Sequence, residues 1–293
     1  YQLAKRRINM PYDVLPNTTP VPIDLNFDVK FEPTKVHDKK YVINNITGEY
    51  LGIVGNGFRC ANHKDFFEGT QNVMNENLSQ EAMSDPQVTW KTARNNAWAM
   101  MDITLPNVTT TILTDKHETK IGQRLIALHG IDGSCSNQVF FGAIDFFCTN
   151  GMIRGDYDKV RRKNTSNFCM DRFIQELNQS SADFYEHTEQ LQQWARKPIT
   201  QTLNMKELLE AIIKSERKAQ KMFPLVQREI SKRGKNVFAL YSAFTNYASY
   251  ADERNGFNLR NTGNDTVSQS MWAREQEVSK WISTPQFKQL VAA

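Results

Sequence analysis

Apolar and polar residues alternate along the first half of the chain with the two-residue period of β-strands. The alternation is clearest over residues 108–114, Val-Thr-Thr-Thr-Ile-Leu-Thr, where one face would be buried and the other rich in hydroxyl groups. Turn-forming pairs, among them Pro106-Asn107 and Asp132-Gly133, separate such runs. The pattern predicts a hairpin over 42–54 that turns at Thr47-Gly48, and then strands over 88–94, 97–105, 108–114, 124–129 and 138–147.

One helix is expected to interrupt these strands. Asn62 is a favourable N-cap, and the apolar residues that follow it fall on one helical face over about residues 63–78. Residues 41–163 are therefore predicted to form a β-rich core, an antiparallel β-meander with one packed helix.

After Asn164 the apolar residues recur with helical spacing. Phe168, Phe173, Ile174, Leu177 and Phe184 mark one helix. The next apolar group, which begins at Leu203, marks a second helix that closes near Ser215 or runs on toward Met222.

Further helices are expected toward the C-terminus. Pro224 suits a boundary or the start of a helix, and Gly234 suits its end. Residues 237–250 are apolar almost all round, which predicts a helix buried on most sides. A loop over 255–265 precedes a last helix that contains Trp272 and Trp281 and is capped by Asp265 or Thr266. Residues 164–293 are thus expected to be an α-helical region packed on the β-rich core, and the fold class is α+β.

Residues 1–40 carry five prolines and no sustained periodicity. Proline removes a backbone donor and biases the residue before it toward extended geometry. This segment is therefore predicted to be an extended, basic arm. Its scattered apolar residues favour packing against another surface, such as the next subunit of a homo-oligomer.

Composition narrows the class of protein. The 293 residues are 40% hydrophobic and 23% charged, which is enough apolar sequence for a sizeable core. No run approaches the 18 or so apolar residues of a membrane span, so no membrane association is expected. Four scattered cysteines without Cys-x-x-Cys spacing are typical of a reduced, intracellular protein, and a zinc site is not expected.

Charge is segregated along the chain. The net charge is only +4, but residues 1–10 and 154–163 each carry +3 and residues 214–235 carry +6, which leaves −8 on the rest. Such clustering is typical of proteins that bind polyanions, although solvated helix faces and a mobile tail explain it equally well.

Motifs for catalysis or cofactor binding are missing. The sequence contains no P-loop, no dinucleotide-binding Gly-x-Gly-x-x-Gly and no His-Glu-x-x-His. The Gly-rich stretch 52–57 lies between strand-like runs and reads as a turn. No cofactor and no metal are therefore predicted. Asp102, Asp145 and His129 are candidate metal or acid–base groups for a hydrolase.

Two segments carry a family resemblance. The Asp132-Gly-Ser turn leads to a strand that ends Phe-Cys-Thr-Asn150-Gly-Met, and a later helix contains Tyr241-Ser-Ala-Phe-Thr-Asn-Tyr. With the opening segment that begins at Tyr50, Tyr-Leu-Gly-Ile-Val-Gly-Asn-Gly-Phe-Arg, they resemble a phage- and plasmid-encoded domain family of unknown function over roughly residues 41–283. The family's usual Arg-His-Thr after Asn-Gly is represented only by Arg-Arg-Lys-Asn-Thr at 161–165. The resemblance implies a place beside phage and plasmid DNA-metabolism genes, hence the bacterial cytoplasm, and brings no catalytic residues.

Three functions follow from these observations. The first is a single-stranded DNA-binding or annealing protein, a cofactor-free homo-oligomer that needs a basic groove and aromatic faces for stacking. Sheet-and-helix units of this kind also occur in phage annealing proteins, which is an analogy of fold only. The alternatives are a metal-dependent nuclease or other hydrolase, and a non-enzymatic structural or host-interaction protein. The residues predicted to contact DNA are Lys5, Arg6, Arg7, Arg59, Lys91, Arg94, Asn150, Arg154, Lys159, Arg161, Arg162, Lys163, Lys218 and Lys221.

Overall fold

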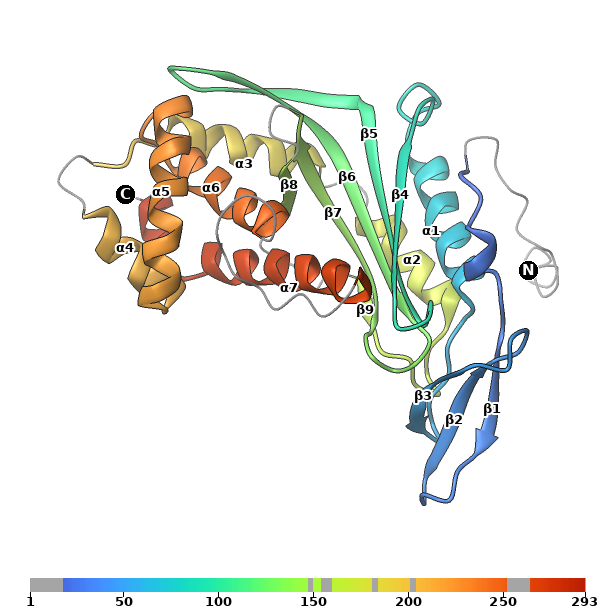
Figure 1. The fold of residues 1–293 in the computed structure, drawn as a ribbon. Helices are drawn as coiled ribbons and strands as arrows, with labels where there is room; N and C mark the ends of the chain where they lie inside the picture. The colour runs from blue at the N-terminus through green and yellow to red at the C-terminus, as the bar shows by residue number, and fades with distance from the viewer. Residues whose placement is uncertain are drawn as a thin grey trace.

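The structure is a computed structural model that describes residues 18–146, 150–153, 160–180, 184–200, 204–251 and 264–292. It has the predicted α+β architecture, with antiparallel sheets in the N-terminal half and helices in the C-terminal half (Figure 1). The buried apolar side chains of the described residues form four hydrophobic clusters.

A small antiparallel sheet opens the described chain. Its strands are β1 (Val29–Pro33), β2 (Lys39–Asn44) and β3 (Tyr50–Gly55), and Gly48 takes a positive φ of 73° in the predicted turn between β2 and β3. A 3-10 turn, η1 (Ile23–Leu25), precedes it and buries Leu25 completely.

The expected arm over residues 1–40 therefore differs from the structure in its second part. Residues 18–40 belong to the folded body because β1 pairs with β2 and because Leu25 and Phe27 are buried. The prolines of this part flank the paired residues or end β1, where a missing N–H does no harm. Residues 1–17 lie outside the described residues.

A six-stranded antiparallel sheet forms the centre of the molecule. Its order is β4-β5-β6-β7-β8, with β9 also paired to β7. The strands are β4 (Gln87–Ala93), β5 (Trp98–Leu113), β6 (Glu118–Gly130), β7 (Asn137–Asp145), β8 (Asn150–Ile153) and β9 (Arg161–Arg162).

Pro106-Asn107 does not separate two strands as predicted. Strand β5 continues through it, and its pairing with β6 only shifts register between Leu105 and Thr109. Strand β6 runs unbroken beside both halves of β5. The backbone N–H that Pro106 lacks therefore causes an irregularity in the hydrogen-bond ladder and not a turn.

Helix α1 (His63–Asn77) begins at the predicted cap, where the Asn62 side chain accepts a hydrogen bond from the Asp65 backbone N–H at 2.7 Å. The region predicted as one helix from Phe168 to Phe184 is two helices, α2 and α3, and Pro224 lies inside α5. The C-terminal helices are α2 (Met170–Ser180), α3 (Phe184–Arg196), α4 (Met205–Ile213), α5 (Glu216–Arg233), α6 (Val237–Tyr250), α7 (Asn264–Ile282) and α8 (Pro285–Ala292).

The continuation of α5 through Pro224 has a packing reason. The proline costs one backbone hydrogen bond, but the residues on both sides of it, Met222, Leu225 and Val226, are buried in the hydrophobic core. Burial of these side chains offsets the lost bond.

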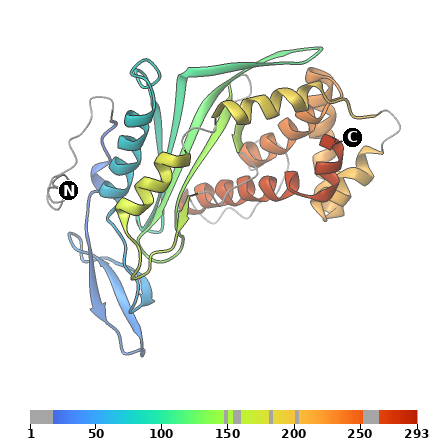
Figure 2. The same cartoon turned by 180° about the vertical axis from the view of Figure 1, so that it is seen from behind.

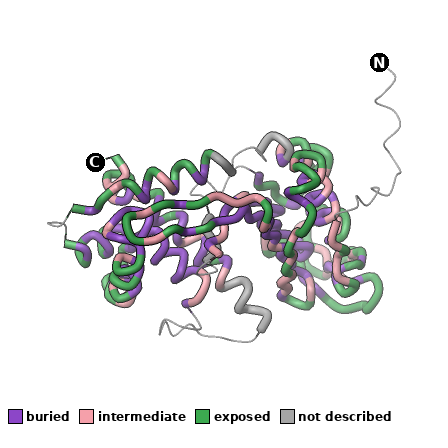
Figure 3. The backbone as a smooth tube through the Cα atoms, turned by 90° about the horizontal axis from the view of Figure 1, so that it is seen from above, coloured by how far each residue is buried: buried purple, intermediate pink, exposed green. Residues whose placement is uncertain are grey.

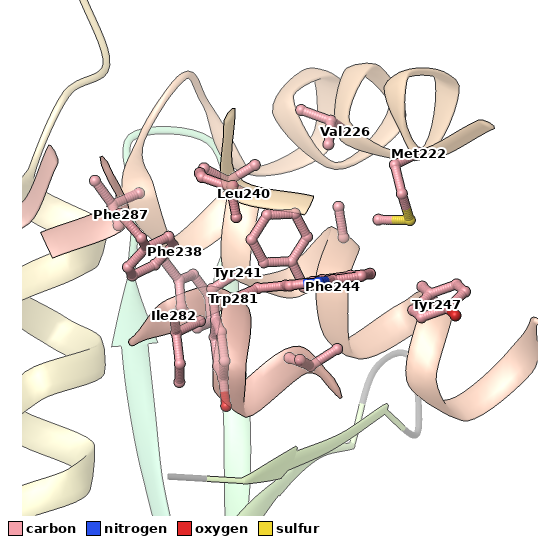
Figure 4. Close-up of a cluster of buried hydrophobic side chains, with 14 of the residues drawn as sticks. Met222, Val226, Phe238, Leu240, Tyr241, Phe244, Tyr247, Trp281, Ile282 and Phe287 are labelled. Atoms are coloured by element: carbon pink, nitrogen blue, oxygen red, sulfur yellow. The ribbon is translucent and has the colours of Figure 1, made fainter. Parts of the chain in front are cut away.

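Helices cover both faces of the central sheet. Helices α1 and α2 pack on one face through a cluster that includes Phe66 and Phe173, and α7 packs on the other face through Trp272 (Figures 1 and 2). The remaining helices, α3 to α6 and α8, form a helical lobe around α6 at one end of the sheet. Figure 3 shows that buried backbone gathers inside this lobe and between the strands and helices. In the interior of the lobe Phe244 contacts Trp281 of α7, with ring centroids 5.2 Å apart, and Phe238 belongs to the same cluster (Figure 4).

Candidate nucleic-acid interface

The end of the central sheet opposite the helical lobe is where four segments of the chain meet. The β4–β5 turn (residues 94–97) binds the β6–β7 turn through the Ile131 N–H, which donates to the Ala97 carbonyl at 2.9 Å. Strand β3 lies so close that a Cβ built on Gly52 would be 3.2 Å from the Asp132 Cβ. Strand β9 pairs with the start of β7. Figure 1 shows this end beside the small sheet.

We call this region the basic end, because it carries Lys40, Arg59, Arg94, Arg161, Arg162 and Lys163. Arg94 donates to Asp132 at 2.5 Å, and its side chain is 50% exposed. The charge of Arg59 contributes to lowering the pKa of Lys40, after burial, and the charges of Arg161 and Arg94 oppose the burial that raises the pKa of Cys135. Arg59 thus lies near Lys40, and Arg94 and Arg161, which come from different segments, both lie near Cys135.

The β4–β5 turn has an unusual backbone. Arg94, Asn95 and Asn96 all have positive φ, between 54° and 62°, although none is glycine. A left-handed residue of this kind costs on the order of 1 kcal/mol or more, so the surroundings must hold the turn. They do so through Asp132 on Arg94, Glu49 on Asn95 and Asp24 on Asn96.

A pair of buried histidines supports the same turn from below. His63, the first residue of α1, places its Nε2 2.8 Å from the Asn96 carbonyl oxygen, and its Nδ1 lies 2.8 Å from Nδ1 of His129 on β6. A carbonyl can only accept, so His63 carries its proton on Nε2, and His129 Nδ1 donates to His63 Nδ1. Burial lowers the pKa of His63 to about 4 and the pKa of His129 well below its usual value. Both rings are neutral, and their role here is to hold the turn.

The segment that carries Arg161, Arg162 and Lys163 is anchored at both ends. Before it, Val160 is buried, and its carbonyl accepts from the Val139 N–H at 3.1 Å. After it, the buried Asn164 side chain donates to the Gly130 carbonyl at 2.6 Å and accepts from Asn137 at 2.6 Å. Because the flanks are buried, the three cations between them project into solvent at a fixed place.

The cations of the basic end differ in how they are paired. Arg162 forms an ion pair with Glu176 of α2, and Arg161 donates weakly to the Ser136 hydroxyl at 3.3 Å. Arg59 and Lys163 are exposed and form no ion pair within the part of the chain that the structure describes. Two cations of the group are thus available to an incoming anion without breaking an internal salt bridge.

Two cysteine thiols lie beside this group. Burial, with a smaller contribution from the charge of Asp132, raises the pKa of both Cys60 and Cys135 to about 12. Both thiols are therefore protonated at neutral pH and are poor nucleophiles.

Other predicted contact residues lie elsewhere. Lys91 is largely buried, 3.9 Å from Asp102 and against Met271 of α7. Lys218 and Lys221 lie on α5 in the helical lobe, and Lys218 pairs with Glu277 at 2.5 Å. The structure brings none of these three to the basic end (Figure 1).

Asn150 was expected at the end of a strand, but it begins β8. That strand pairs antiparallel with the far end of β7, where Asn150 lies opposite Asp145, and β8 lies against α6. The reversal from β7 to β8 thus carries the Asn-Gly pair to the helical lobe, away from Arg161 and Arg162. Lys5, Arg6, Arg7, Arg154 and Lys159 lie outside the described residues.

The groups considered for hydrolysis are dispersed. Asp102 accepts two hydrogen bonds from Arg124 on the α7 side of the sheet, whereas His129 packs against α1 on the opposite side. Asp145 is fully buried and pairs with Arg233. Over the described ranges, no three His, Cys, Asp or Glu side chains are placed to hold a metal ion.

Sequence reasoning missed Lys40 and the anchor Asn164. Lys40 lies on β2 and donates to the Phe58 carbonyl at 2.8 Å, which fixes the loop that leads to Arg59. Asn164 directly follows three consecutive cations in the sequence. This position could have suggested it, because a buried amide there can fix an exposed basic segment.

Comparison with known proteins identifies the family. A family model described as "Domain of unknown function (DUF932)" matches residues 50–286, well over half of the chain. The chain therefore belongs to this family. No curated protein and no solved structure matches the chain. None of the helices in the described ranges is long and apolar enough to cross a membrane.

Proposed function

We propose that this protein binds single-stranded DNA through the basic end and promotes strand annealing as a homo-oligomer. The observation that supports the proposal most is the Arg161-Arg162-Lys163 segment, which is exposed yet pinned by Val160 and Asn164. Fixed cations lose little side-chain freedom when they meet phosphates, and their affinity comes from counterion release. From the resemblance we infer phage and plasmid DNA metabolism as the setting.

The geometry favours single strands over a duplex read by sequence. The cations of the basic end lie on turns and on the two-residue strand β9, not on a helix that could enter a major groove. Turns of this size can follow one flexible backbone. Binding with weak sequence preference is therefore expected.

A fluorescence-anisotropy titration with a labelled 30-nucleotide oligo(dT) at two salt concentrations tests the proposal. The variant Arg161→Ala/Arg162→Ala/Lys163→Ala should lose about tenfold or more in affinity, and its dependence on salt should be shallower. Its melting temperature should change little, because exposed ion pairs contribute at most about 1 kcal/mol.

A matched control removes the same charge elsewhere. Arg196, Arg217 and Lys280 are exposed on α3, α5 and α7, and their joint replacement by alanine should leave the affinity within about twofold. Equal losses in both triple variants would show non-specific attraction, and a parent protein that does not bind at low salt would refute the proposal.

The homo-oligomer is proposed from the apolar residues of the N-terminal segment. Because residues 18–40 belong to the folded body, the relevant truncation removes residues 1–17 only. We expect this truncation to lower the mass per particle measured by light scattering, since the segment would pack on a neighbouring subunit. An unchanged mass would eliminate this mode of assembly and leave DNA binding untouched.

A further inference from the structure

The two faces of the small sheet are unlike each other. On the inner face Val42, Leu51 and Val54 are buried against Ala97 and Ile131 of the central sheet's turns, together with Phe58. On the outer face the register places Tyr41 beside Ile53 and Ile43 beside Tyr50. Four apolar side chains are thus contiguous on a face that nothing in the described chain covers fully: Tyr50 is 51% and Ile53 46% exposed.

A β-bulge creates this arrangement. The pairing of β2 with β3 shifts between Val42 and Ile43, so that Leu51 and Gly52 are both buried and the alternation restarts. Without the extra residue Val54 would point outward and Ile53 inward. Bulges re-aim side chains in this way and are frequent beside functional sites. Here the bulge keeps both Tyr50 and Ile53 on the outer face.

The tyrosine rings are held in place before any ligand arrives. Tyr41 and Tyr50 contact each other edge to face, with ring centroids 5.5 Å apart and planes at 76°. Because the rings are nearly perpendicular, only one can offer its flat face to a given planar ligand. Tyr50 is the more exposed of the two rings, at 51%, and Tyr41 packs against it.

Charges on and beside this face match a polyanion. Lys39 lies on the outer face next to Tyr41, and Lys35 lies in the adjoining hairpin turn. Both are exposed and form no ion pair within the described residues, whereas Lys30 is neutralised by Glu32 at 2.6 Å. Lys40 of the basic end lies on the same strand, but its side chain points to the inner face, where it donates to the Phe58 carbonyl and lies over the Phe31 ring. An aromatic face with neighbouring free cations and hydroxyls suits a stacked nucleobase and its phosphate better than it suits a purely apolar protein segment.

We propose that the outer face of the small sheet is a stacking platform for single-stranded DNA, on which Tyr50 takes a base and Lys39 a phosphate. This inference rests on the proposed function and extends its site from the basic end onto the small sheet. Stacking of one base on an aromatic side chain contributes about 1–3 kcal/mol and tolerates any base.

The test compares two labelled 30-nucleotide probes, oligo(dT) and an abasic oligomer with the same number of phosphates. The parent protein should prefer oligo(dT). Tyr50→Ala should lose about tenfold in affinity for oligo(dT) and lose the preference, whereas Tyr50→Phe should keep both, because phenylalanine still stacks. Lys39→Ala should weaken binding to both probes equally and reduce the salt slope by about one.

Controls separate the platform from the basic end. Leu113 at the tip of β5 is 52% exposed, similar to Tyr50, and Leu113→Ala should not change either affinity. The Arg161/Arg162/Lys163 variant should weaken binding to both probes and keep the preference for bases. If Tyr50→Ala binds oligo(dT) like the parent while this triple variant is weak, the platform is refuted and the proposed function stands.

The remaining outcomes also decide. If the parent binds neither probe, the proposed function fails and the platform fails with it. If Tyr50→Ala leaves DNA affinity unchanged and lowers the mass per particle in light scattering, the outer face is a protein interface, and the platform is overturned. A melting temperature close to the parent's, expected for an exposed residue, shows that the variant is folded.

Discussion

The basic end and the helical lobe both contain runs of cations, but part of the second run is buried or paired inside the fold. Residues 161–163 and 214–235 are both basic runs, and the second carries the larger excess of charge. In the first, buried neighbours leave the cations in solvent. In the second, Arg233 is fully buried and Lys218 is paired across to α7. Charge along the sequence therefore does not tell which cations are exposed, because that depends on what packs around each of them.

The buried cation of the helical lobe joins helix to sheet. Arg233, the last residue of α5, binds Asp145 of β7 at 2.6 Å, Glu229 one turn earlier at 3.0 Å, and the Thr119 hydroxyl of β6. On the α7 side, Arg124 links Asp102 of β5 with Glu275. Such pairs add little net stability over an apolar core, but they are costly to break from one side.

The largest expected effect comes from breaking this joint. Arg233→Met removes the cation and takes this ion pair away from the buried carboxylates of Asp145 and Glu229. We expect a loss of about 3–5 kcal/mol in the free energy of unfolding, measured by urea denaturation. The exposed Arg217 on the same helix is the control, and Arg217→Ala should change stability by less than about 0.5 kcal/mol.

A second variant keeps this prediction open to refutation if Arg233→Met does not fold. In Arg233→Met/Asp145→Asn/Glu229→Gln neutral amides replace the two carboxylates, so most of the lost stability should return. If Arg233→Met is as stable as the parent, water reaches the ion pairs of Arg233. The helical lobe would then not differ from the basic end in burying its cations.

An intermediate effect is expected from acid, which acts on the basic end. In the unfolded chain His63 takes up a proton near pH 6.5. In the folded protein burial lowers the pKa of His63 to about 4, so its ring stays neutral down to about that pH. The folded state thus binds fewer protons, and stability falls as the pH drops from about 6.5 to about 4. At pH 5 the loss should be on the order of 2 kcal/mol relative to pH 7.

The groups that face this histidine pair are few. Among the residues that the structure describes, the Asn96 carbonyl and the charge of Asp132 both favour the protonated form of His63, and the charge of His63 lowers the pKa of His129. In His63→Gln/His129→Leu the fall in melting temperature between pH 7 and pH 5 should shrink. His37→Gln, a change at an exposed imidazole, should keep the parent's fall. An equal fall in all three proteins would place the acid-sensitive group elsewhere.

The sequence predicted the local structure well where one residue decides it. The Asn62 cap of α1, the Gly48 turn and the buried helix α6 are all confirmed, because a cap, a left-handed glycine and an all-round apolar helix depend on neighbours in the chain. The α+β class follows from the change of period near Asn164.

What the sequence could not predict depends on long-range packing. Pro224 continues a helix because of residues buried around it, and Arg233 reads as a surface cation until Asp145 and Thr119 are placed beside it. The same holds for the outer face of the small sheet, since a one-residue bulge in β3 decides whether Ile53 or Val54 is exposed.

The smallest expected effect is that of replacing two lysines of the helical lobe, Lys218 and Lys221. Lys218 and Lys221 belong to the basic run of α5, so the charge pattern alone would predict that they contact DNA. In the structure the Lys218 ammonium pairs with Glu277 and lies 5.5 Å and 5.8 Å from the ring centres of Tyr247 and Trp281. We therefore expect Lys218→Ala/Lys221→Ala to bind oligo(dT) within about twofold of the parent, with an unchanged salt slope. Stability should fall by no more than about 1 kcal/mol, because the side chains of the Lys218–Glu277 pair are about one-third exposed. A loss of affinity as large as that of the Arg161/Arg162/Lys163 variant would mean that the strand runs over both regions, because Lys218 would then leave an internal partner for a phosphate.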